Sequence, residues 1–451
     1  SSHVNPHYRV MSITKHARCN GVSLSKDFVL SLLKVAVKRK DIQAGRRIHL
    51  LMLSHGLYTH SILADHLIHL FALCKSLSES LQSFRMVPYP SVFTWNIVIS
   101  AHLKLGGDEK AMDLFIEMQS RGTKPDNVTF SCILKVCVNV RALKQGRFTH
   151  DLIIRTGLKE SMVMESTLVD MYAKCGSVRE AHNVFNNMEK QDVITWGTMV
   201  AAYAEQDGII ALELFNKMQG HDFLKPNIIV FSSVLKACGS IKDLNQGKVV
   251  HDKIERSGLQ SDFVIGSTLV DMYVKCESIH EARATFDRLE MRDIVTWGTM
   301  MHGYVIHKQC LNAFQLFETM KMCGLIPNTI IFECLLEACN VLEDIEHGRI
   351  LECQISALEL QLNPCMYNTL LYMYCKAGSL NEAHRVFHMW SSHDFPSWDY
   401  LIDQYVQNGH FISAFNLYEE MQEEGILPNK STIFMHLLKA CQGLGVECLD
   451  K

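Results

Sequence analysis

The chain has 451 residues, of which 48% are hydrophobic and 20% charged, so it can bury a core and is not an intrinsically disordered sequence. Its net charge of −4 excludes a positive field over the whole molecule, so any nucleic-acid site has to be local. Residues 1–50 carry ten Lys and Arg against two Asp, which leaves the other 401 residues with a net charge of −12.

The first segment, residues 1–25, is predicted to be a basic extension. It contains Arg9, Lys15 and Arg18 and no acidic residue. This composition is compatible with sequence that flanks a transit peptide. No apolar run reaches the roughly 18 residues of a membrane span, so no membrane contact is expected. The sixteen cysteines form no C-x-x-C pair. We therefore predict reduced thiols in a cytosolic or organelle-matrix setting, with no disulfide and no bound metal.

The rest of the chain repeats itself with a period of 101 residues. Trp95, Trp196, Trp297 and Trp398 are each 101 apart, and STLVDMYAKC at 166–175 returns as STLVDMYVKC at 267–276. Each period divides into three pieces, whose lengths are 35, 35 and 31. Every piece has two stretches with apolar residues at three- and four-residue spacing, which predicts two short amphipathic helices. Such helices cannot bury their apolar faces alone, so successive pairs must stack.

The predicted fold is therefore all-α: one right-handed solenoid of about 24 helices with no sheet, rather than three domains. Its twelve full hairpins and one shortened unit have the boundaries 26–60, 61–91, 92–126, 127–161, 162–192, 193–227, 228–262, 263–293, 294–328, 329–363, 364–394, 395–430 and 431–451. Lys430 is an extra residue by this count, so the final boundary is uncertain by one position.

Three stretches carry a resemblance to a known family: DVITWGTMVAAYAEQ at 192–206, the Leu-Lys-Ala-Cys strings at 235–238 and 438–441, and MYAKCGSVREAHNVF at 171–185. These resemble pentatricopeptide repeats, and the 35-35-31 alternation is similar to the plant P-L-S subclass. The tetratricopeptide repeat is also a helical hairpin but has a 34-residue period. The three lengths and the Tyr-Ala-Lys-Cys-Gly string favour the pentatricopeptide repeat.

The resemblance implies a solenoid that binds single-stranded RNA, one base per repeat, through the fifth and the last residue of each repeat. In the family's pairing, Asn96/Asp126 and Asn368/Asp394 match the pair for uracil. Ser166/Asp192 and Ser267/Asp293 match the pair for guanine. Gly197/Asn227 and Gly298/Asn328 would recognise adenine weakly, because they lack a fifth-position hydroxyl. The RNA predicted from 5′ to 3′ is U-x-G-A-x-G-A-x-U.

The other repeats match less well. Asp65/Ser91 and Asp399/Asn429 correspond to no strong pair, and Ser131/Ser161, Ser232/Asp262 and Glu333/Asn363 belong to units that resemble spacers. The second residue of a repeat is expected to hold a base by its face. Val163, Ile194, Ile229, Val264 and Val295 suit this role, Cys365 is marginal and Pro396 departs from it.

Two structural alternatives stand beside these assignments. Asp192, Asp293 and Asp394 each precede a predicted helix, where a side-chain acceptor would cap it. We assign Lys75, Lys174, Lys275 and Lys376 to position 13 of the 31-residue units, which would place a cation repeatedly along one face. That row could contact phosphates, or it could be a set of solvated helix ends that favour Lys.

No catalytic motif is present, so an enzyme and a cofactor are not expected. His280-Glu281 begins an H-E-x-x-H pattern, but Ala284 occupies the second His position. The zinc deaminase sequences found at the end of many proteins of this subclass are also missing, so a C-terminal extension or another protein would have to supply that activity.

The predicted function is sequence-selective binding of single-stranded RNA in an organelle matrix, with the mitochondrion slightly preferred to the chloroplast. The role predicted first is recognition of C-to-U editing sites, and splicing or transcript stabilisation are the next alternatives. The expected partner is a deaminase-bearing or other RNA-processing protein, and no small-molecule substrate is expected. The rival is a structural subunit of a large organellar assembly such as the ribosome, which the net charge of −12 beyond residue 50 favours.

Overall fold

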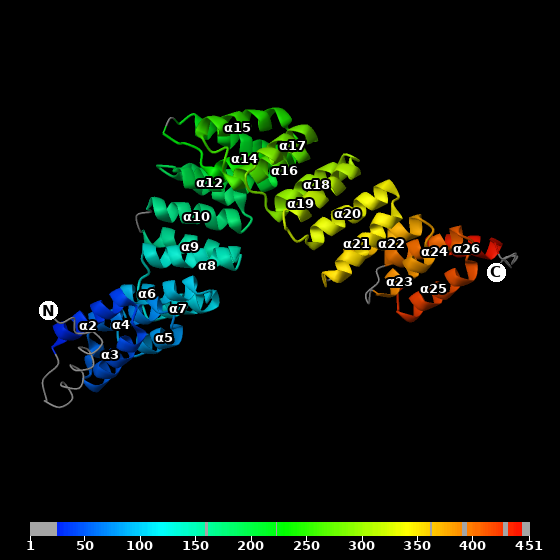
Figure 1. Cartoon of the computed structure of the whole chain (residues 1–451). Helices are drawn as coiled ribbons and strands as arrows, with labels where there is room; N and C mark the ends of the chain where they lie inside the picture. Colours follow the sequence, from blue (N-terminus) through cyan, green and yellow to red (C-terminus); the bar gives the residue numbers. More distant parts are fainter. Residues whose placement is uncertain are drawn as a thin grey trace, which may run out of the picture. The chain divides into compact units, whose positions relative to one another are not determined.

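The computed structural model describes residues 25–157, 161–221, 223–360, 363–389, 395–426 and 432–443. Over these ranges the chain forms 25 α-helices, α2 to α26, with one short 3-10 helix and no β-strand (Figure 1). The prediction of an all-α solenoid of helical repeats is confirmed.

Each repeat contributes a first and a second helix. The first helices are α2 (Lys26–Arg39), α4 (Ser61–Leu73), α6 (Val92–Lys104), α8 (Asn127–Asn139), α10 (Met162–Lys174), α12 (Val193–Gln206), α14 (Ile228–Ile241), α16 (Phe263–Lys275), α18 (Ile294–Ile306), α20 (Thr329–Leu342), α22 (Pro364–Lys376), α24 (Phe395–Gln407) and α26 (Thr432–Gly443). All but α26 begin at the first residue of a predicted repeat, and residue 431, where the last unit was predicted to begin, lies outside the described residues.

The second helices explain the two repeat lengths. They are α3 (Ile42–Ser54), α5 (Leu77–Arg85), α7 (Asp108–Ser120), α9 (Leu143–Thr156), α11 (Val178–Asn187), α13 (Gly208–Gln219), α15 (Leu244–Ser257), α17 (Ile279–Arg288), α19 (Cys310–Met322), α21 (Ile345–Ala357), α23 (Leu380–Met389) and α25 (Phe411–Glu423), and the 3-10 helix η1 (Leu57–Thr59) follows α3. In the 31-residue repeats this helix has 9 or 10 residues, against 12 to 14 in the longer repeats. The difference in repeat length is therefore about one helical turn.

The helices group into two compact units. The first comprises residues 1–206 and 213–230, and the second comprises 207–212 and 231–451. The border between them runs through the predicted repeats 193–227 and 228–262 and not along a linker. The first turn of α13 belongs to the second unit, where a β-carbon on Gly208 would lie 2.7 Å from Ile241 of α14. Glycine at this position allows the two helices to approach closely.

The four tryptophans that revealed the period form the core between repeats. Each is buried and meets, edge to face, a phenylalanine from the second helix of the preceding 31-residue repeat. The ring centroids are 4.6 to 5.0 Å apart in the pairs Phe84–Trp95, Phe185–Trp196, Phe286–Trp297 and Phe387–Trp398. Such pairs stabilise by about 0.5–1.5 kcal/mol beyond the area they bury. The tryptophans thus act in packing, and α5, α11, α17 and α23 contact the helix that follows each of them.

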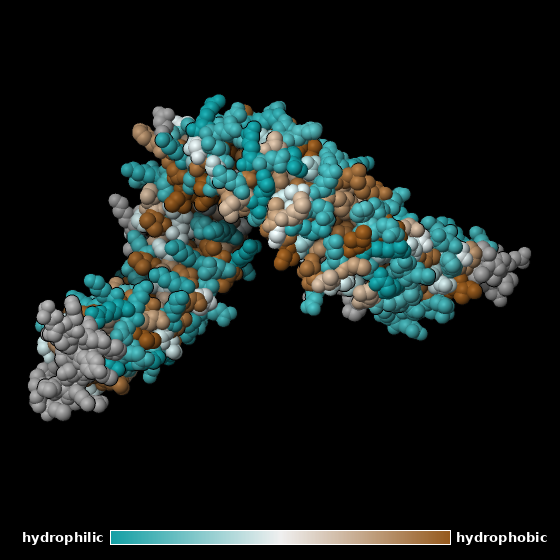
Figure 2. Space-filling view, in the orientation of Figure 1, coloured by the Kyte–Doolittle hydropathy of each residue, from teal (hydrophilic) through white to brown (hydrophobic). Residues whose placement is uncertain are grey.

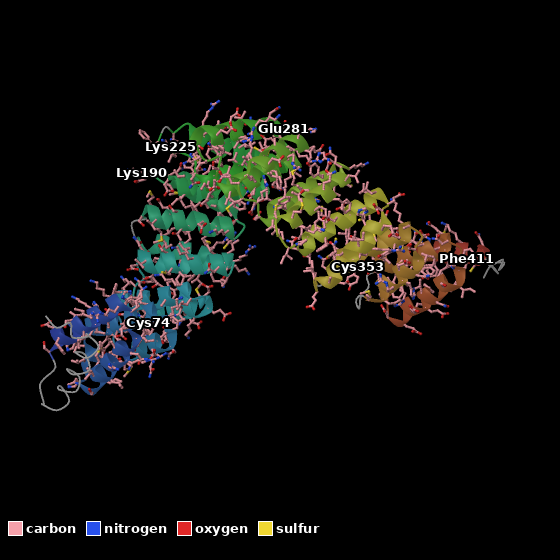
Figure 3. The ribbon with its side chains drawn as sticks, in the orientation of Figure 1. Cys74, Lys190, Lys225, Glu281, Cys353 and Phe411 are labelled. Carbon is pink, nitrogen blue, oxygen red and sulfur yellow. The ribbon has the colours of Figure 1, made fainter. Side chains whose placement is uncertain are left out.

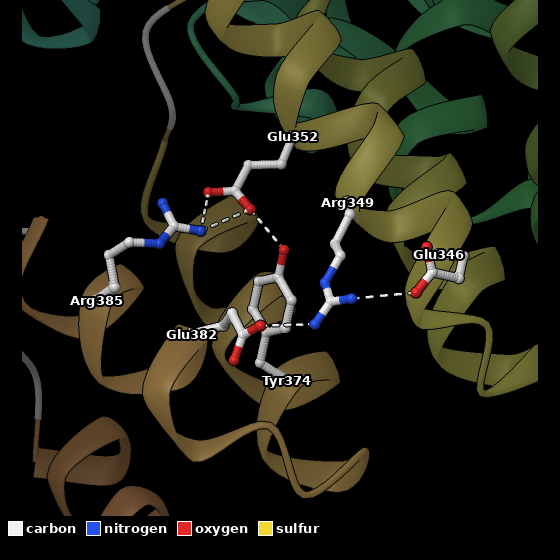
Figure 4. A network of polar contacts seen from close by, with 6 residues as sticks. All are labelled: Glu346, Arg349, Glu352, Tyr374, Glu382 and Arg385. Atoms are coloured by element: carbon white, nitrogen blue, oxygen red, sulfur yellow. Dashed lines mark hydrogen bonds and ion pairs between the residues drawn. The ribbon is translucent and has the colours of Figure 1, made fainter.

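A second periodic set of contacts joins the second helices of neighbouring repeats. A cation and a glutamate 33 residues later form the ion pairs Arg46–Glu79, Arg147–Glu180, Lys248–Glu281 and Arg349–Glu382, with N–O distances of 2.6 to 2.8 Å. Glu281, labelled in Figure 3, lies on α17. In Figure 4 the pair Arg349–Glu382 lies beside Glu352, which accepts hydrogen bonds from Tyr374 and Arg385. These pairs are partly exposed, so they add little stability and mainly keep the repeats in register.

The fourteen cysteines of the described ranges are all free thiols. Burial raises the pKa of Cys238, Cys334 and Cys339 to about 12, so these are neutral, unreactive core residues at physiological pH. Within the same ranges no group of three or more His, Cys, Asp or Glu could hold a metal ion. None of the helices described is long and apolar enough to cross a membrane.

Candidate nucleic-acid interface

The second residue of nearly every repeat is an exposed apolar side chain at the start of the first helix. The fractional exposure is 50–68% for Ile62, Phe93, Val128, Val163, Ile194, Ile229, Val264, Val295 and Ile330. Cys365 and Pro396 at the same position are exposed too. Figure 2 shows hydrophobic surface interspersed with hydrophilic surface in both units. A regular series of such residues favours contact with a ligand that has flat apolar faces. Val163, Ile194, Ile229, Val264 and Val295 were expected at this position from the sequence, and the shared position adds Ile62, Phe93, Val128 and Ile330.

The last residue of a repeat caps the first helix of the next one. Its side-chain oxygen accepts a hydrogen bond from the backbone N–H three residues later, at 2.8 to 3.3 Å. The residues that do so are Ser91, Asp126, Ser161, Asp192, Asn227, Asp262, Asp293, Asn328 and Asn363. The capping role is therefore present, and it occupies one side-chain oxygen. A carboxylate keeps its second oxygen for another partner. Asp394 and Asn429 lie outside the described residues.

In repeat 92–126 the structure brings the fifth and the last residue together. Asn96 donates from Nδ2 to both carboxylate oxygens of Asp126, at 3.0 and 3.1 Å, and its Oδ1 accepts from the Thr129 hydroxyl at 2.6 Å. Burial would raise the pKa of Asp126, but the hydrogen bonds from Thr129 and Asn96 outweigh it and lower the pKa. Asp126 is therefore ionised at neutral pH, and the pair offers one remaining N–H donor beside a carboxylate acceptor.

The serine pairs have a different arrangement. The Ser166 hydroxyl donates to the carbonyl oxygen of Met162 at 2.6 Å, and the Ser267 hydroxyl donates to that of Val264 at 3.0 Å. Within the described residues no hydrogen bond joins Ser166 to Asp192 or Ser267 to Asp293. Because each hydroxyl hydrogen is used within its helix, the serine oxygen is left as an acceptor, and the capping aspartate supplies a second acceptor in the same repeat.

The glycine pairs present one side chain only. A β-carbon on Gly197 would lie 3.3 Å from Val230, and one on Gly298 would lie 3.6 Å from Ile331. The nearest side chain beside each glycine is therefore an aliphatic residue of the next repeat, and the amide of Asn227 or Asn328 is the polar group that remains.

Two other fifth residues have a hydroxyl partner. The Thr94 hydroxyl donates to Asp65 at 2.6 Å, and burial raises the pKa of this aspartate. The Ser397 hydroxyl donates to Oδ1 of Asn368 at 2.9 Å.

Three clefts between neighbouring first helices contain these residues. In the first unit, a cleft of about 740 Å³ is lined by Phe93, Asn96, Asp126, Val128, Lys75 and Lys104. Next to it, a cleft of about 730 Å³ is lined by Val128, Ser131, Val163, Lys104, Lys135 and Lys174. In the second unit, a cleft of about 360 Å³ is lined by Val295, Gly298, Asn328, Ile330, Glu333 and Glu337. Each cleft thus combines second-position apolar residues with polar residues of the predicted pairs or spacer units.

The row of lysines needs a correction. Lys174, Lys275 and Lys376 are the last residues of α10, α16 and α22, but position 13 of repeat 61–91 is Leu73. Lys75 lies two residues beyond the end of α4 in the left-handed conformation, with φ of 61°. The assignment of Lys75 to position 13 was therefore wrong. The order is Cys-Lys at 74–75, whereas it is Lys-Cys at 174–175 and 275–276.

The three helical lysines are also engaged already. They form ion pairs with Asp170, Asp271 and Glu343 at 3.0, 2.7 and 2.9 Å, respectively. Lys75 has no ion-pair partner among the described residues. Lys104 and Lys135, which sequence analysis missed, line the clefts of the first unit. They are positions 13 and 9 of repeats of the 35-residue type, so a search confined to the 31-residue units could not find them.

The fold and this surface define a class: an α-solenoid of helical hairpins with one exposed apolar residue and one capping polar residue per repeat. Family models agree with it. The PPR repeat family matches residues 90–139 and 292–340, PPR repeats match 166–193, 358–391 and 396–426, and the pentatricopeptide repeat domain matches 190–240. The chain belongs to the pentatricopeptide repeat family.

Known relatives extend the comparison. A chloroplastic pentatricopeptide repeat-containing protein of Arabidopsis thaliana is 31% identical over 417 residues, which are 92% of this chain and 67% of the relative. A mitochondrial one from the same plant is 29% identical over 415 residues, 90% of this chain and 59% of that protein. The chain thus spans about three fifths to two thirds of the length of these two relatives.

A solved structure shows the same fold. The pentatricopeptide repeat protein PPR10 of maize, in complex with an 18-nt psaJ RNA element, matches with a TM-score of 0.70 at 18% identity. The match covers 97% of this chain and 70% of PPR10.

Proposed function

We propose that this protein binds single-stranded RNA sequence-selectively along the surface formed by the first helices. The observation that carries the proposal is the hydrogen-bonded pair Asn96–Asp126 in a cleft between Phe93 and Val128. An apolar side chain on each side suits the face of a base, and the polar pair suits its edge. Lys75 and Lys104 line the same cleft and would neutralise the phosphates.

The hydrogen-bond inventory supports the proposed base assignments. A donor beside an acceptor, as at Asn96/Asp126, complements the carbonyl and imino N–H of uracil. Two acceptors, as at Ser166/Asp192 and Ser267/Asp293, complement the imino and amino N–H groups of guanine. We extend uracil to Asn368/Asp394 and weak adenine preference to Gly197/Asn227 and Gly298/Asn328, which gives U-x-G-A-x-G-A-x-U.

We further propose that the protein works in an organelle as a P-L-S-type member, without catalytic activity of its own. The relatives include chloroplastic and mitochondrial proteins, which supports an organelle, while the preference for the mitochondrion stays a prediction. Recognition of C-to-U editing sites for a deaminase-bearing partner remains the first role, ahead of splicing or transcript stabilisation.

A second role is favoured by a specific observation. Glu333 and Glu337 line the cleft of the second unit, where carboxylates would repel phosphates. A structural subunit of a large organellar assembly such as the ribosome could use such a surface for protein.

The first test is crosslinking in the source organelle, followed by sequencing of the bound transcripts. The second is a gel-shift titration with RNAs that differ at single positions. Asn96→Ser should move one position from U towards G and weaken the original RNA by roughly 1–3 kcal/mol. Equal affinity for U and G in both the wild type and Asn96→Ser would mean that the pair is only structural, and the assembly-subunit role would then lead.

A further inference from the structure

A hydroxyl from the following repeat contacts the fifth residue in three of the four repeats where that residue is Asn or Asp, the exception being Asp399, which precedes Ile433. The donor is always the third residue of the next repeat. The contacts are Thr94 to Asp65 at 2.6 Å, Thr129 to Asn96 at 2.6 Å and Ser397 to Asn368 at 2.9 Å. Thr94 and Thr129 are fully buried, so these hydroxyls belong to the repeat interface and do not themselves face solvent.

Where the fifth residue is Gly, the third residue of the next repeat is aliphatic. Val230 follows Gly197 and Ile331 follows Gly298, and a β-carbon added at each glycine would contact that side chain, at 3.3 and 3.6 Å respectively. Among the described residues the hydroxyl contact is therefore specific to Asp65, Asn96 and Asn368, because some other polar fifth residues, such as Ser232 before Ile265, are followed by an apolar third residue, as the two glycines are.

We propose that the third residue of the following repeat is a specificity-determining position, which orients the fifth residue for base recognition. The inference rests on the proposed function and names a residue that sets its selectivity. Thr129 acts as a positioning residue, because its hydroxyl contacts Asn96 from the buried side and not from the cleft.

The geometry at Asn96 shows how this works. An Asn side chain can flip about its last side-chain bond and exchange its carbonyl oxygen with its amino group. The Thr129 hydroxyl lies 2.6 Å from Oδ1 of Asn96 and 2.9 Å from Oδ1 of Asp126, so the shorter contact is with the amide. Donation to that amide holds its carbonyl on the buried side and leaves the amino group facing Asp126 and the cleft.

Removal of the hydroxyl should loosen this arrangement. Without that donor the Oδ1 atom of Asn96 is a buried acceptor with no partner, and nothing on the buried side fixes the amide any longer. An Asn96 side chain that is free to leave Asp126 presents its donor less regularly to the cleft, so it should discriminate less between U and G.

The loss experiment compares Thr129→Val with Thr129→Ser. Gel-shift titrations would use RNAs with U or G at the nucleotide facing repeat 92–126. Thr129→Val should reduce the U-over-G preference about tenfold, the range of one base-edge contact, and Thr129→Ser should restore it. Thermal unfolding by circular dichroism shows that each variant is folded.

Thr195 supplies a matched control. It is equally buried and is also the third residue of its repeat, but its hydroxyl donates to Asp192 at 2.8 Å and not to Ser166. Thr195→Val should lower stability while leaving the base preference of repeat 162–192 unchanged within about twofold. If Thr129→Val weakens U and G RNAs equally, the hydroxyl is only structural and the inference fails, although RNA binding by Asn96 still stands. If the wild type itself has no base preference there, the proposed function fails together with the inference.

The gain experiment uses the second unit. Gly298→Asn with Asn328→Asp would install the polar pair above Ile331, which cannot donate a hydrogen bond. Adding Ile331→Thr completes the set found at Asn96, Asp126 and Thr129. We expect the triple variant, and not the double variant, to gain roughly a tenfold preference for U at that nucleotide. Equal preference in both variants would overturn the role of the third residue.

Discussion

The cleft at Asn96 and the cleft at Gly298 occupy equivalent repeats two full periods apart, one in each unit. The second-position residues stay apolar and exposed in both, with Phe93 and Val128 matched by Val295 and Ile330. The polar residues differ. Asn96, Asp126, Thr129, Ser131 and Lys135 are replaced by Gly298, Asn328, Ile331, Glu333 and Glu337.

The difference shows that one scaffold separates packing from recognition. Both regions keep the Phe–Trp core contact, at 4.6 Å for Phe84–Trp95 and 5.0 Å for Phe286–Trp297, so the helices stack in the same way. The few side chains above that core change from a hydrogen-bonded pair with lysines to a glycine with carboxylates. We therefore expect the first unit to account for most of the RNA affinity.

The largest effect is expected from Phe93→Ala. Phe93 is 63% exposed and lines the cleft, so its removal should weaken RNA binding by about 1–3 kcal/mol, the range for stacking of a base on an aromatic ring. Val295→Ala at the matched position removes less apolar surface beside carboxylates and should change binding by less than about 0.5 kcal/mol. Fluorescence anisotropy with labelled RNA would measure both. A larger loss for Val295→Ala would reverse the ranking of the two units.

A charge exchange should have the next largest effect. Lys135→Glu should weaken binding about tenfold at low salt, and Glu337→Lys should strengthen it. Each unit of charge should change the slope of log affinity against log salt concentration by about 0.7, the value for single strands. Titrations at four salt concentrations would show this. Equal slopes for wild type and both variants would exclude phosphate contact at this position in either unit.

A smaller effect is expected from the helical lysines. Lys174→Ala should weaken all RNA sequences alike and flatten the salt dependence. Because Asp170 already holds Lys174 at 3.0 Å, the loss should be under about 1 kcal/mol and smaller than that of Lys75→Ala. Gel-shift titrations with the base-substituted RNAs would compare the two variants. A loss confined to one base would mean that Lys174 contacts a base edge instead of the phosphates.

The smallest effect concerns acid stability, which the two units share. Hydrogen bonds from Lys248 and Ser278 lower the pKa of Glu281 to about 2, below its ordinary value of 4.5, and Arg147 and Ser177 lower that of Glu180. A carboxylate with a depressed folded-state pKa stabilises fully above its ordinary pKa of 4.5, and this contribution is lost as the pH falls towards about 2. Ser278→Ala should therefore reduce stability at pH 7 by less than about 1 kcal/mol, because the site is partly exposed, and should have less effect at about pH 3.

Urea unfolding at both pH values would measure this, with Ser177→Ala as the equivalent change in the first unit. A similar outcome for both variants would show that the units differ in their clefts and not in this ion-pair network. An increased effect at the lower pH would contradict the depressed pKa.

Much of the site could be predicted from single residues and their register. Asn96 and Asp126 lie near opposite ends of one repeat, and the repeat boundaries alone placed them at its fifth and last positions. The capping role of Asp192 and Asp293 also followed from local chemistry, because a cap needs only an acceptor three residues before its N–H. The position of Lys75 could not be found in this way. Cys74 and Lys75 stand in the opposite order to Lys174 and Cys175, which keeps the composition of the segment but moves the lysine beyond the end of the helix.

The sequence by itself determined the periodic properties of this protein. The 101-residue period and the two helices in each repeat follow from spacing, because a helix of given apolar pattern has one face to bury. The role of the second residue was implied by the family resemblance instead. Only the tertiary structure decided which polar groups meet. That Thr129 donates to Asn96 while Thr195 donates to Asp192, and that Asp170 already pairs with Lys174, depends on distances of a few tenths of an ångström between side chains. Such distances are set by how neighbouring repeats stack, which no spacing of residues along the chain specifies.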